Sequence, residues 1–316
     1  MTIEERMVKK LSYLFAITII SLNIFAQTPY DFLLLDASPR SAALAGSFVA
    51  NNDDPNVIFY NPAGLNLIEE TPISFSYLSH IADINYTSLA ASHNFEGIGR
   101  ISGGIQYINY GNFTRRDAQG TDLGSFGAGD MALTVGYSNK LDDNFYYGVN
   151  VKFIYTSLED QSSTAFATDW GLQYVMPEDG WSFGLSILNA GGQISSYFDK
   201  KEDLPLDVRV GVYKELAHTP FKLFFSLNRL NEKEDNLADR FKKITLGSEI
   251  RISNVIKFRF GYDNDKRKDW KISDASGLAG VSLGLGIKVQ KYNIDYAFTS
   301  MGSIGSLHRF GLITSF

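Results

Sequence analysis

The sequence is 316 residues long, carries a formal net charge of −6 at pH 7 and contains no cysteine. Without cysteine the chain cannot form disulfides, thiolate metal sites, a lipid-anchored N-terminus or a cysteine nucleophile. Its acidic balance also argues against nucleic acid as a partner, because surfaces that bind nucleic acid are basic.

The chain begins with the features of a secretory signal peptide. Two lysines precede an apolar stretch from Leu11 to Phe25, and the small residue Ala26 offers a cleavage point. A membrane anchor is the alternative, but the stretch is shorter than the roughly 20 residues that a spanning helix needs. We therefore expect residues 1–26 to be a signal peptide that directs export. Two early glutamates fit such a leader poorly, which leaves Met7 open as the true start.

The next segment, residues 27–72, is interrupted by prolines. Asp54-Pro55 and Asn61-Pro62 restrict the backbone before each proline and favour turns or helix starts. The apolar residues between them are expected to form a short element that packs inside a barrel, while the acids cap its start or meet basic side chains. We expect the segment to act as a plug, with candidate residues Asp53, Asp54, Pro55, Asn61 and Pro62.

From residue 73 to residue 316 the sequence alternates with the two-residue period of β-strands. In Val281 to Val289 every odd position is apolar and every even position is small or polar, as in a strand with two unlike faces. Fourteen such segments can be counted, and an even number is typical of bacterial single-chain barrels. Their centres fall near Phe75, Leu89, Ile105, Val135, Val151, Trp170, Leu185, Val210, Phe225, Gly247, Phe258, Leu283, Tyr296 and Leu312.

The two faces of these segments differ in charge. The apolar face is rich in Tyr, Phe and Trp near the segment ends, which matches the aromatic girdles of a membrane barrel better than the Val, Ile and Leu core of a soluble sandwich. The charges lie on the small or polar face. We therefore expect these residues to face the lumen: Lys152, Asp169, Arg209, Glu249, Arg251, Lys257, Arg259, Lys288 and Asp295.

The connections between segments also follow a pattern. Every second connection is a turn of five residues or fewer, such as Pro177 to Gly180, and most of the others are longer, such as Gly111 to Gly127. Outer-membrane barrels have short periplasmic turns and long extracellular loops. The sequence therefore predicts an all-β fold, a 14-stranded antiparallel transmembrane outer-membrane barrel over residues 73–316, closed by an N-terminal plug with short helical turns.

The final strand ends in an aromatic residue. Phe310 and Leu312 share one face, and Phe316 closes the chain. This ending resembles the terminal signature by which barrel-assembly machinery recognises its clients, so we expect that machinery to be a partner during biogenesis and outer-membrane lipid to surround the mature protein.

Patterns for catalysis and for cofactors find no support. The four histidines are far apart and none stands in a His-Glu-x-x-His arrangement. The stretch Gly284-Leu285-Gly286 lies mid-strand with no helix after it, so it does not predict a dinucleotide site. We expect no enzyme activity, no cofactor and no metal.

The inward charges allow two interpretations. They could line a conducting channel, or they could pair across the lumen and close it. Opposite signs on neighbouring strands, Glu249 and Arg251 beside Lys257 and Arg259, favour pairing.

The plug segment resembles the N-terminal signature of FadL-like barrels, in particular of the PorV/PorQ group of type IX secretion proteins, over YDFLLLDASPRSAALAGSFVANNDDPNVIFYNPAGL. Two later stretches look more like PorQ than PorV: YGNFTRRDAQGTDLGSFGAGDMALTVGYSNKL and GLAGVSLGLGIKVQKYNIDYAFTS. The resemblance runs from Tyr30 to Phe316. It implies a 14-stranded outer-membrane barrel with an N-terminal plug.

The resemblance also implies a role in type IX secretion, in which the barrel docks or anchors PorU-, PorV- or PorZ-like partners for secretion and surface attachment of cargo. The tract Asn61-Pro62-Ala63-Gly64 is shared with the wider FadL-like class, so a transporter of hydrophobic small molecules remains the alternative. A general porin is disfavoured because the N-terminal segment is built to occlude. A transporter should show a continuous apolar pocket from the loops to the plug, whereas a charge-crossed, closed lumen would argue against transport.

Overall fold

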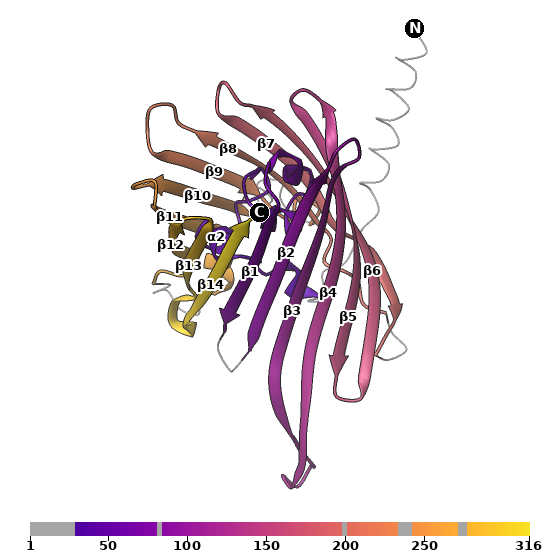
Figure 1. Ribbon diagram of the computed structural model, residues 1–316. Coiled ribbons are helices and arrows are strands. Elements are labelled where there is room, and N and C mark those ends of the chain that lie inside the picture. The colour runs from indigo at the N-terminus through magenta and orange to yellow at the C-terminus, as the bar shows by residue number, and fades with distance from the viewer. Residues whose placement is uncertain (1–28, 81–83, 198–200, 233–241, 271–276) are drawn as a thin grey trace.

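The computed structural model describes residues 29–80, 84–197, 201–232, 242–270 and 277–316, and the expected signal peptide lies outside them. Within this part of the chain, fourteen antiparallel strands form a closed barrel in which β1 pairs with β14 (Figure 1). The expected strand number and order are confirmed. The strands are β1 (Pro72–Ser79), β2 (Asn85–Phe95), β3 (Gly99–Arg116), β4 (Asp122–Asp142), β5 (Phe145–Leu158), β6 (Gln161–Met176), β7 (Trp181–Ser195), β8 (Asp207–Glu215), β9 (Phe221–Leu227), β10 (Ile244–Arg251), β11 (Ile256–Asp263), β12 (Val281–Val289), β13 (Tyr292–Ser300) and β14 (Ser306–Ser315).

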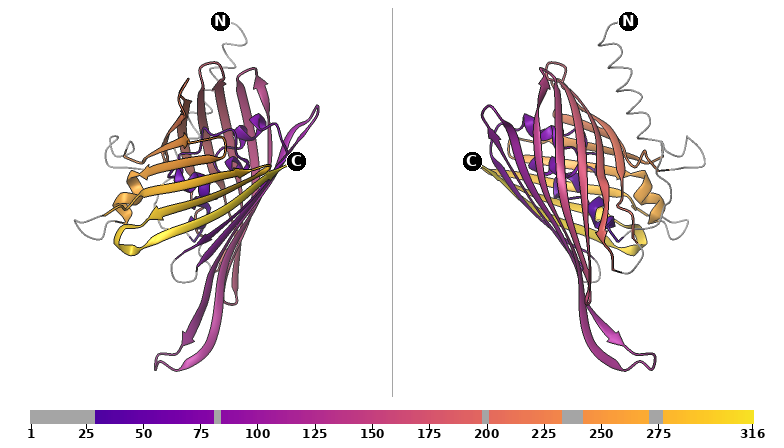
Figure 2. Two further views of the ribbon diagram at one scale, coloured as in Figure 1. Left: turned by 60° about the vertical axis from the view of Figure 1, so that its left-hand side comes forward. Right: turned by 90° about the vertical axis from the view of Figure 1, so that its right-hand side faces the viewer.

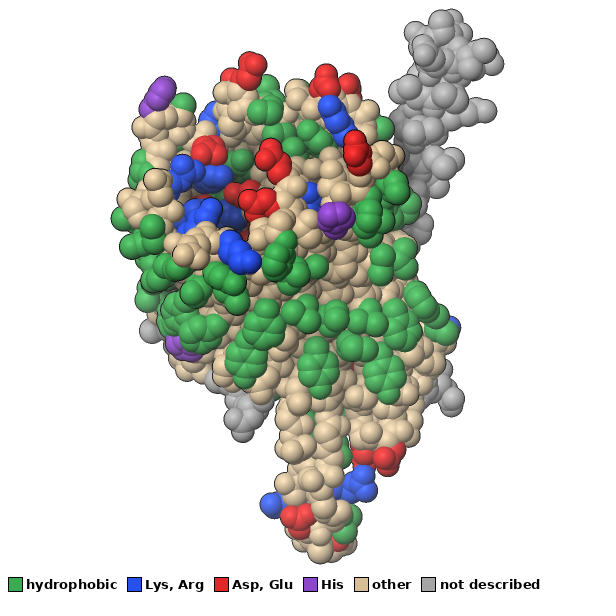
Figure 3. Space-filling view, in the orientation of Figure 1, with side chains coloured by type: hydrophobic (Ala, Val, Ile, Leu, Met, Phe, Trp, Pro, Cys, Tyr) green, Lys and Arg blue, Asp and Glu red, His purple; other side chains and the backbone are tan. Residues whose placement is uncertain are grey.

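The outer surface of the barrel is apolar. In β1 burial alternates at every residue, and Ile73, Phe75 and Tyr77 point outward while Ser74 and Ser76 point inward. Figure 3 shows the hydrophobic side chains as a band across the visible face of the wall, with charged side chains gathered beyond it. Lipid is the natural solvent for such a band, and closure of the sheet leaves no strand edge to be hydrogen-bonded there.

The two ends of the barrel differ. Turns after the even-numbered strands are short, and we call their side the short-turn end; the opposite side is the long-loop end, although Glu159–Asp160 between β5 and β6 is also a tight connection. In outer-membrane barrels the short turns are periplasmic. None of the helices in the described ranges is long and apolar enough to cross a membrane.

The expected long loop from Gly111 to Gly127 is wrong. β3 and β4 continue past the wall as a two-stranded hairpin that protrudes at the long-loop end (Figure 1). Phe113 lies opposite Phe126, and their rings stack with centroids 5.4 Å apart. Such cross-strand aromatic pairs stabilise a hairpin, which explains why strand pairing persists in a stretch rich in turn-forming residues.

Four short helices lie in the segment that precedes β1: η1 (Asp31–Leu34), α2 (Pro39–Ala43), η2 (Pro55–Phe59) and η3 (Pro62–Leu67). Figure 2 shows this segment running through the interior of the barrel. We refer to described residues 29–71 as the plug. Two further helices, α4 (Asn264–Asp269) and η5 (Gly302–Ile304), belong to connections at the long-loop end.

Three plug helices start in the same way, with a capping side chain followed by proline. Ser38 accepts a hydrogen bond from the backbone of Ser41, Asp54 from Asn56 at 2.9 Å, and Asn61 from Ala63 at 3.1 Å. The cap satisfies an orphan N–H group, and proline at the first helical position needs none. The sequence thus encodes three short turns rather than one long helix.

Candidate functional site: the plugged lumen

The plug enters the interior at the long-loop end. Tyr30, Phe32 and Leu33 are buried in an apolar cluster with inward-facing wall residues, among them Leu78 and Tyr86. We call the part of the lumen that these three plug residues fill the apolar chamber. The chain then crosses to the short-turn end before it joins β1.

The middle of the plug lies directly against the wall backbone. Among the described residues, nine inward-facing glycines would each place an added Cβ within about 3 Å of a plug atom. At Gly184 the carbonyl oxygen of Val49 would lie 2.2 Å away, and at Gly171 the side-chain oxygen of Asn61 would lie 2.1 Å away. Only glycine allows so close an approach at these sites. We call this set the glycine belt: Gly104, Gly148, Gly171, Gly184, Gly211, Gly247, Gly261, Gly284 and Gly311.

Polar wall side chains bind the irregular backbone of the plug. Asn150 of β5 donates to the carbonyl oxygen of Ile58 at 2.8 Å. Gln173 of β6 and Ser182 of β7 donate to the carbonyl oxygen of Ala50 at 2.8 and 2.9 Å. Non-helical backbone at membrane depth is tolerated only where protein or water satisfies its polar groups. The small and polar inner face of the strands supplies those groups here.

Arg40 of α2 is the centre of a chain of ion pairs between plug and wall. Its guanidinium donates to Asp53 Oδ1 at 2.7 Å within the plug and to Glu249 Oε2 of β10 at 3.0 Å. Glu249 also accepts from Arg259 of β11 at 2.7 Å, and Arg259 donates to Asp295 of β13 at 2.5 Å. This chain of pairs, which we call the Arg40 network, ties the plug to three strands on one side of the barrel.

The pKa values of the two neighbouring acids of the plug are shifted in opposite directions. Burial alone raises the pKa of Asp53, but Arg40 and Lys222 hold it well below its usual value of 3.8. Burial raises the pKa of Asp54 above that value and outweighs the attraction of Arg40, whose nearest nitrogen lies 3.6 Å away. Asp54 therefore serves mainly as the cap of η2, whereas Asp53 serves as an ion-pair partner.

Some of the remaining expected lumen charges form buried pairs on the wall, and the others lie at the short-turn end. Lys152 and Asp169 are fully buried and pair at 2.9 Å on the wall. Arg209 pairs with Asp207 at 2.6 Å. At the short-turn end Arg251 is exposed beside Glu215, and Lys257 and Lys288 line a pocket described below.

The other predicted residues are placed as follows. Pro55 and Pro62 stand at the first positions of η2 and η3. Phe310 and Leu312 point outward from β14, and Phe316 ends the chain with 72% of its surface exposed.

Sequence reasoning missed Arg40, although a signal was present. Arg40 is the only charged residue between Asp36 and Asp53, in an otherwise small and apolar stretch. It also missed a second tie between plug and wall, in which Lys266 of α4 donates to Asp36 at 2.8 Å. In the described ranges no cluster of three or more histidine or acidic side chains is placed to hold a metal ion.

A closed 14-stranded barrel with an apolar outer band and an internal N-terminal plug defines an outer-membrane β-barrel of FadL-like fold. No family model matches the sequence, and no curated protein matches it.

Solved structures do match the fold. The Pseudomonas putida toluene transporter TodX is 11% identical, with a TM-score of 0.54, over 88% of this chain and 96% of that one. The CymD monoaromatic hydrocarbon channel is 13% identical, with a TM-score of 0.55, over 90% and 98%. A Pseudomonas aeruginosa FadL homologue is 10% identical, with a TM-score of 0.53, over 89% and 98%. At these identities the likeness establishes the fold alone.

Proposed function

We propose that this protein is a closed outer-membrane barrel that docks or anchors partner proteins for secretion and surface attachment of cargo, as a PorQ-like component of type IX secretion. The observation that carries the proposal is the seating of the plug. The glycine belt and the Arg40 network join plug and wall from several sides. A lumen filled by a plug that is held in this way suits a scaffold better than a passage for apolar molecules.

The protruding β3–β4 hairpin supports a docking role. Past Asn109 and before Gly127 its backbone pairs only with itself, so both of its edges are available to a partner. A two-stranded ribbon alone is marginally stable in water. A partner protein that paired with one of its edges would stabilise it. The resemblance of residues 30–316 to the PorV/PorQ group supplies the class of partner, PorU-, PorV- and PorZ-like proteins. In this proposal the barrel itself catalyses nothing.

Gene deletion tests this function. Loss of the gene should move cargo with a C-terminal signal from the cell surface to other fractions, because its attachment partners lose their anchor. Proteomes of the medium and the surface would be compared between the deletion strain and the same strain carrying the gene in trans. An affinity pull-down should recover PorU-, PorV- or PorZ-like proteins. Normal cargo sorting and no such partner would reject the proposal.

The second candidate is a transporter of hydrophobic small molecules, and the comparisons favour it over the first. TodX is described as a toluene transporter and CymD as a monoaromatic hydrocarbon channel.

One feature of this structure also fits transport. Arg309 of β14 is buried, its Nε and Nη1 atoms lack hydrogen-bond acceptors, and it lies opposite Leu78 of the apolar chamber. A buried guanidinium beside an apolar space would suit a hydrophobic compound with an acidic head if the first plug residues left the chamber. Uptake of a labelled aromatic hydrocarbon and a labelled long-chain acid by the deletion strain would test this role. Uptake equal to that of the complemented strain counts against it.

A further inference from the structure

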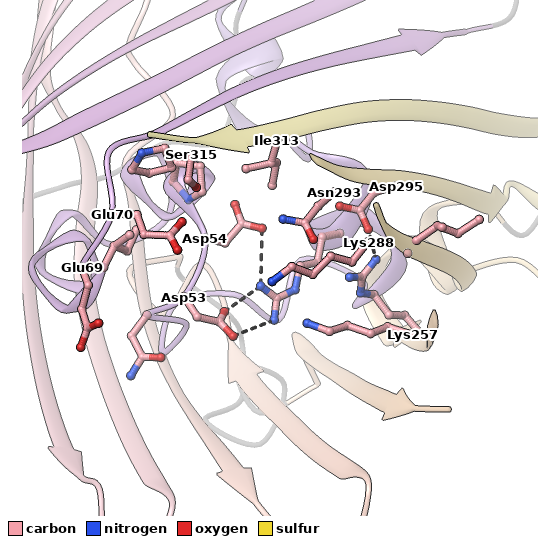
Figure 4. Close-up of a pocket in the computed structure, with 18 of the residues that line it drawn as sticks. Asp53, Asp54, Glu69, Glu70, Lys257, Lys288, Asn293, Asp295, Ile313 and Ser315 are labelled. Carbon is pink, nitrogen blue, oxygen red and sulfur yellow. Dashed lines mark hydrogen bonds and ion pairs between the residues drawn. The ribbon is translucent and has the colours of Figure 1, made fainter. Parts of the chain in front are cut away.

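A pocket of about 320 Å³ opens at the short-turn end, between the last part of the plug and strands β11 to β13 (Figure 4). Figure 3 shows basic and acidic side chains gathered around this mouth of the barrel. Its floor is the Arg40 network, in which both guanidinium groups already face carboxylates. We call this cavity the short-turn pocket.

One wall of the short-turn pocket carries two lysines that no carboxylate pairs closely. Lys257 and Lys288 extend into it from β11 and β12 (Figure 4). The nearest carboxylate oxygen to Lys257 belongs to Glu249 at 3.8 Å, and 37% of the lysine side chain is exposed. Within the described part of the chain, Lys288 is exposed and has no carboxylate oxygen within 4.0 Å. Two ammonium groups from neighbouring strands thus line one pocket, where an anion would be attracted to both.

The plug contributes an acceptor to the same space. Asp54 is only 1% exposed, and the backbone and side chain of Asn56 both donate to its Oδ1. Its Oδ2 atom accepts no hydrogen bond and has only the ion-pair contact with Arg40 at 3.6 Å. Figure 4 shows the Asp54 carboxylate directed into the pocket. A buried carboxylate oxygen without a donor is costly, and a ligand N–H group would remove that cost.

We propose that the short-turn pocket binds the carboxylate of a peptide, with the carboxylate between Lys257 and Lys288 and an amide N–H of the same ligand on Oδ2 of Asp54. Sulfate or chloride would lack the donor, and an apolar compound would leave every polar group unmatched. The volume is at the lower end of the roughly 300–1,000 Å³ typical of small-molecule sites, so one or two residues would enter. Because the short turns are periplasmic in such barrels, the peptide would belong to a periplasmic protein.

Glu69 and Glu70 line the pocket on the side opposite the lysines (Figure 4). They would repel a second acidic group, so the rest of the bound peptide should be neutral or basic. The inference goes beyond the proposed function, since the site binds a peptide carboxylate or fails to do so whichever process the barrel serves.

Titration calorimetry on the full mature protein in detergent micelles tests the site. The probes are acetyl-Ala-Ala with a free carboxylate, the same dipeptide as its C-terminal amide, and acetate. We expect the carboxylate form to bind at least about tenfold more tightly than the amide, because charge-assisted hydrogen bonds are lost in the amide. Replacing both lysines, Lys257→Gln with Lys288→Gln, should cost a similar factor. Lys140→Gln, which changes an exposed lysine near the end of β4, is the matched control and should change nothing.

The variant Asp54→Asn distinguishes binding of a peptide from binding of a simple anion. It should weaken the dipeptide several-fold but not acetate, which has no N–H group to donate. If the dipeptide and its amide bind with equal affinity, or if the lysine substitutions leave the affinity of the dipeptide unchanged, the proposed site is overturned. Acetate binding as tightly as the dipeptide would overturn the peptide assignment. If the Asp54 variant fails to fold, the lysine substitutions, which change one partly exposed and one exposed side chain, still decide the outcome.

Discussion

Arg40 links two acids from different parts of the fold, Asp53 from the plug and Glu249 from the wall. Removing one partner of a buried ion pair leaves an uncompensated charge and costs about 3–5 kcal/mol, even though forming the pair contributes little net stability. The network therefore fixes where the plug sits more than it adds to overall stability. Its partners could not be predicted, because Arg40 and Glu249 are 209 positions apart and only closure of the barrel brings them together.

The neighbouring acids Asp53 and Asp54 should respond differently to loss of charge. Asp53→Asn should lower the free energy of unfolding at pH 7 by about 1 kcal/mol, a modest value because 38% of the Asp53 side chain is exposed. Asp54→Asn should change it by less than about 0.5 kcal/mol, since asparagine caps a helix as well as aspartate does. Urea unfolding in detergent micelles, followed by tryptophan fluorescence, measures both. Equal losses in the two variants would contradict the assignment.

The pH dependence of folding stability follows from the opposite pKa shifts of Asp53 and Asp54. The folded pKa of Asp53 is below its ordinary value of 3.8, so its stabilisation is complete above about pH 4 and is lost as the pH falls toward the folded pKa. The folded pKa of Asp54 is raised, so its contribution is present at low pH and is lost as the pH rises through the folded pKa. Asp53→Asn should therefore flatten the loss of stability in acid, and Asp54→Asn should not. Unfolding curves at pH 3, 4, 5 and 7 would show the difference.

The plug is an irregular segment, and the small and polar inner face of the strands accommodates it. The caps and prolines of η2 and η3 could be predicted from Asp54-Pro55 and Asn61-Pro62 because capping is local. The glycine belt could not be predicted, because glycine at an inward position shows only that space is needed and not what fills it. The β3–β4 hairpin was missed because turn-forming residues obscure strand pairing that depends on one aromatic pair.

The glycine belt predicts that a single methyl group can unseat the plug. Gly184→Ala should place its Cβ 2.2 Å from the carbonyl oxygen of Val49, which cannot move without its neighbours, and should cost about 1–3 kcal/mol. Single-channel recordings in planar bilayers should then show higher ion conductance than the wild-type barrel. Gly103→Ala is the control, because its Cβ would face lipid with the nearest atom 4.0 Å away. Unchanged conductance in a folded Gly184→Ala barrel would show that the plug seals without this contact.

For the whole molecule, the strand count and order could be predicted from periodicity and turn spacing, since both properties are local and repeat along the chain. The state of the lumen depends on contacts between the plug and distant strands, so the alternation of the strands could not determine it. Docking and transport differ in one physical requirement. A docking barrel works with the plug fixed, whereas passage of a compound through the lumen requires the plug to move.

A disulfide between plug and wall separates the two functions. The chain has no cysteine, so Leu44→Cys with Gly247→Cys would add a single pair. The Cβ atom of Leu44 lies 3.1 Å from the position of a Cβ at residue 247, a few tenths of an ångström below the usual separation in disulfides. In a docking barrel, the oxidised and reduced forms of this variant should sort cargo equally. In a transporter, oxidation should abolish uptake of the labelled hydrocarbon and reduction should restore it. The reduced form of the same variant controls for the lost leucine, so a difference between the two redox states can arise only from plug movement.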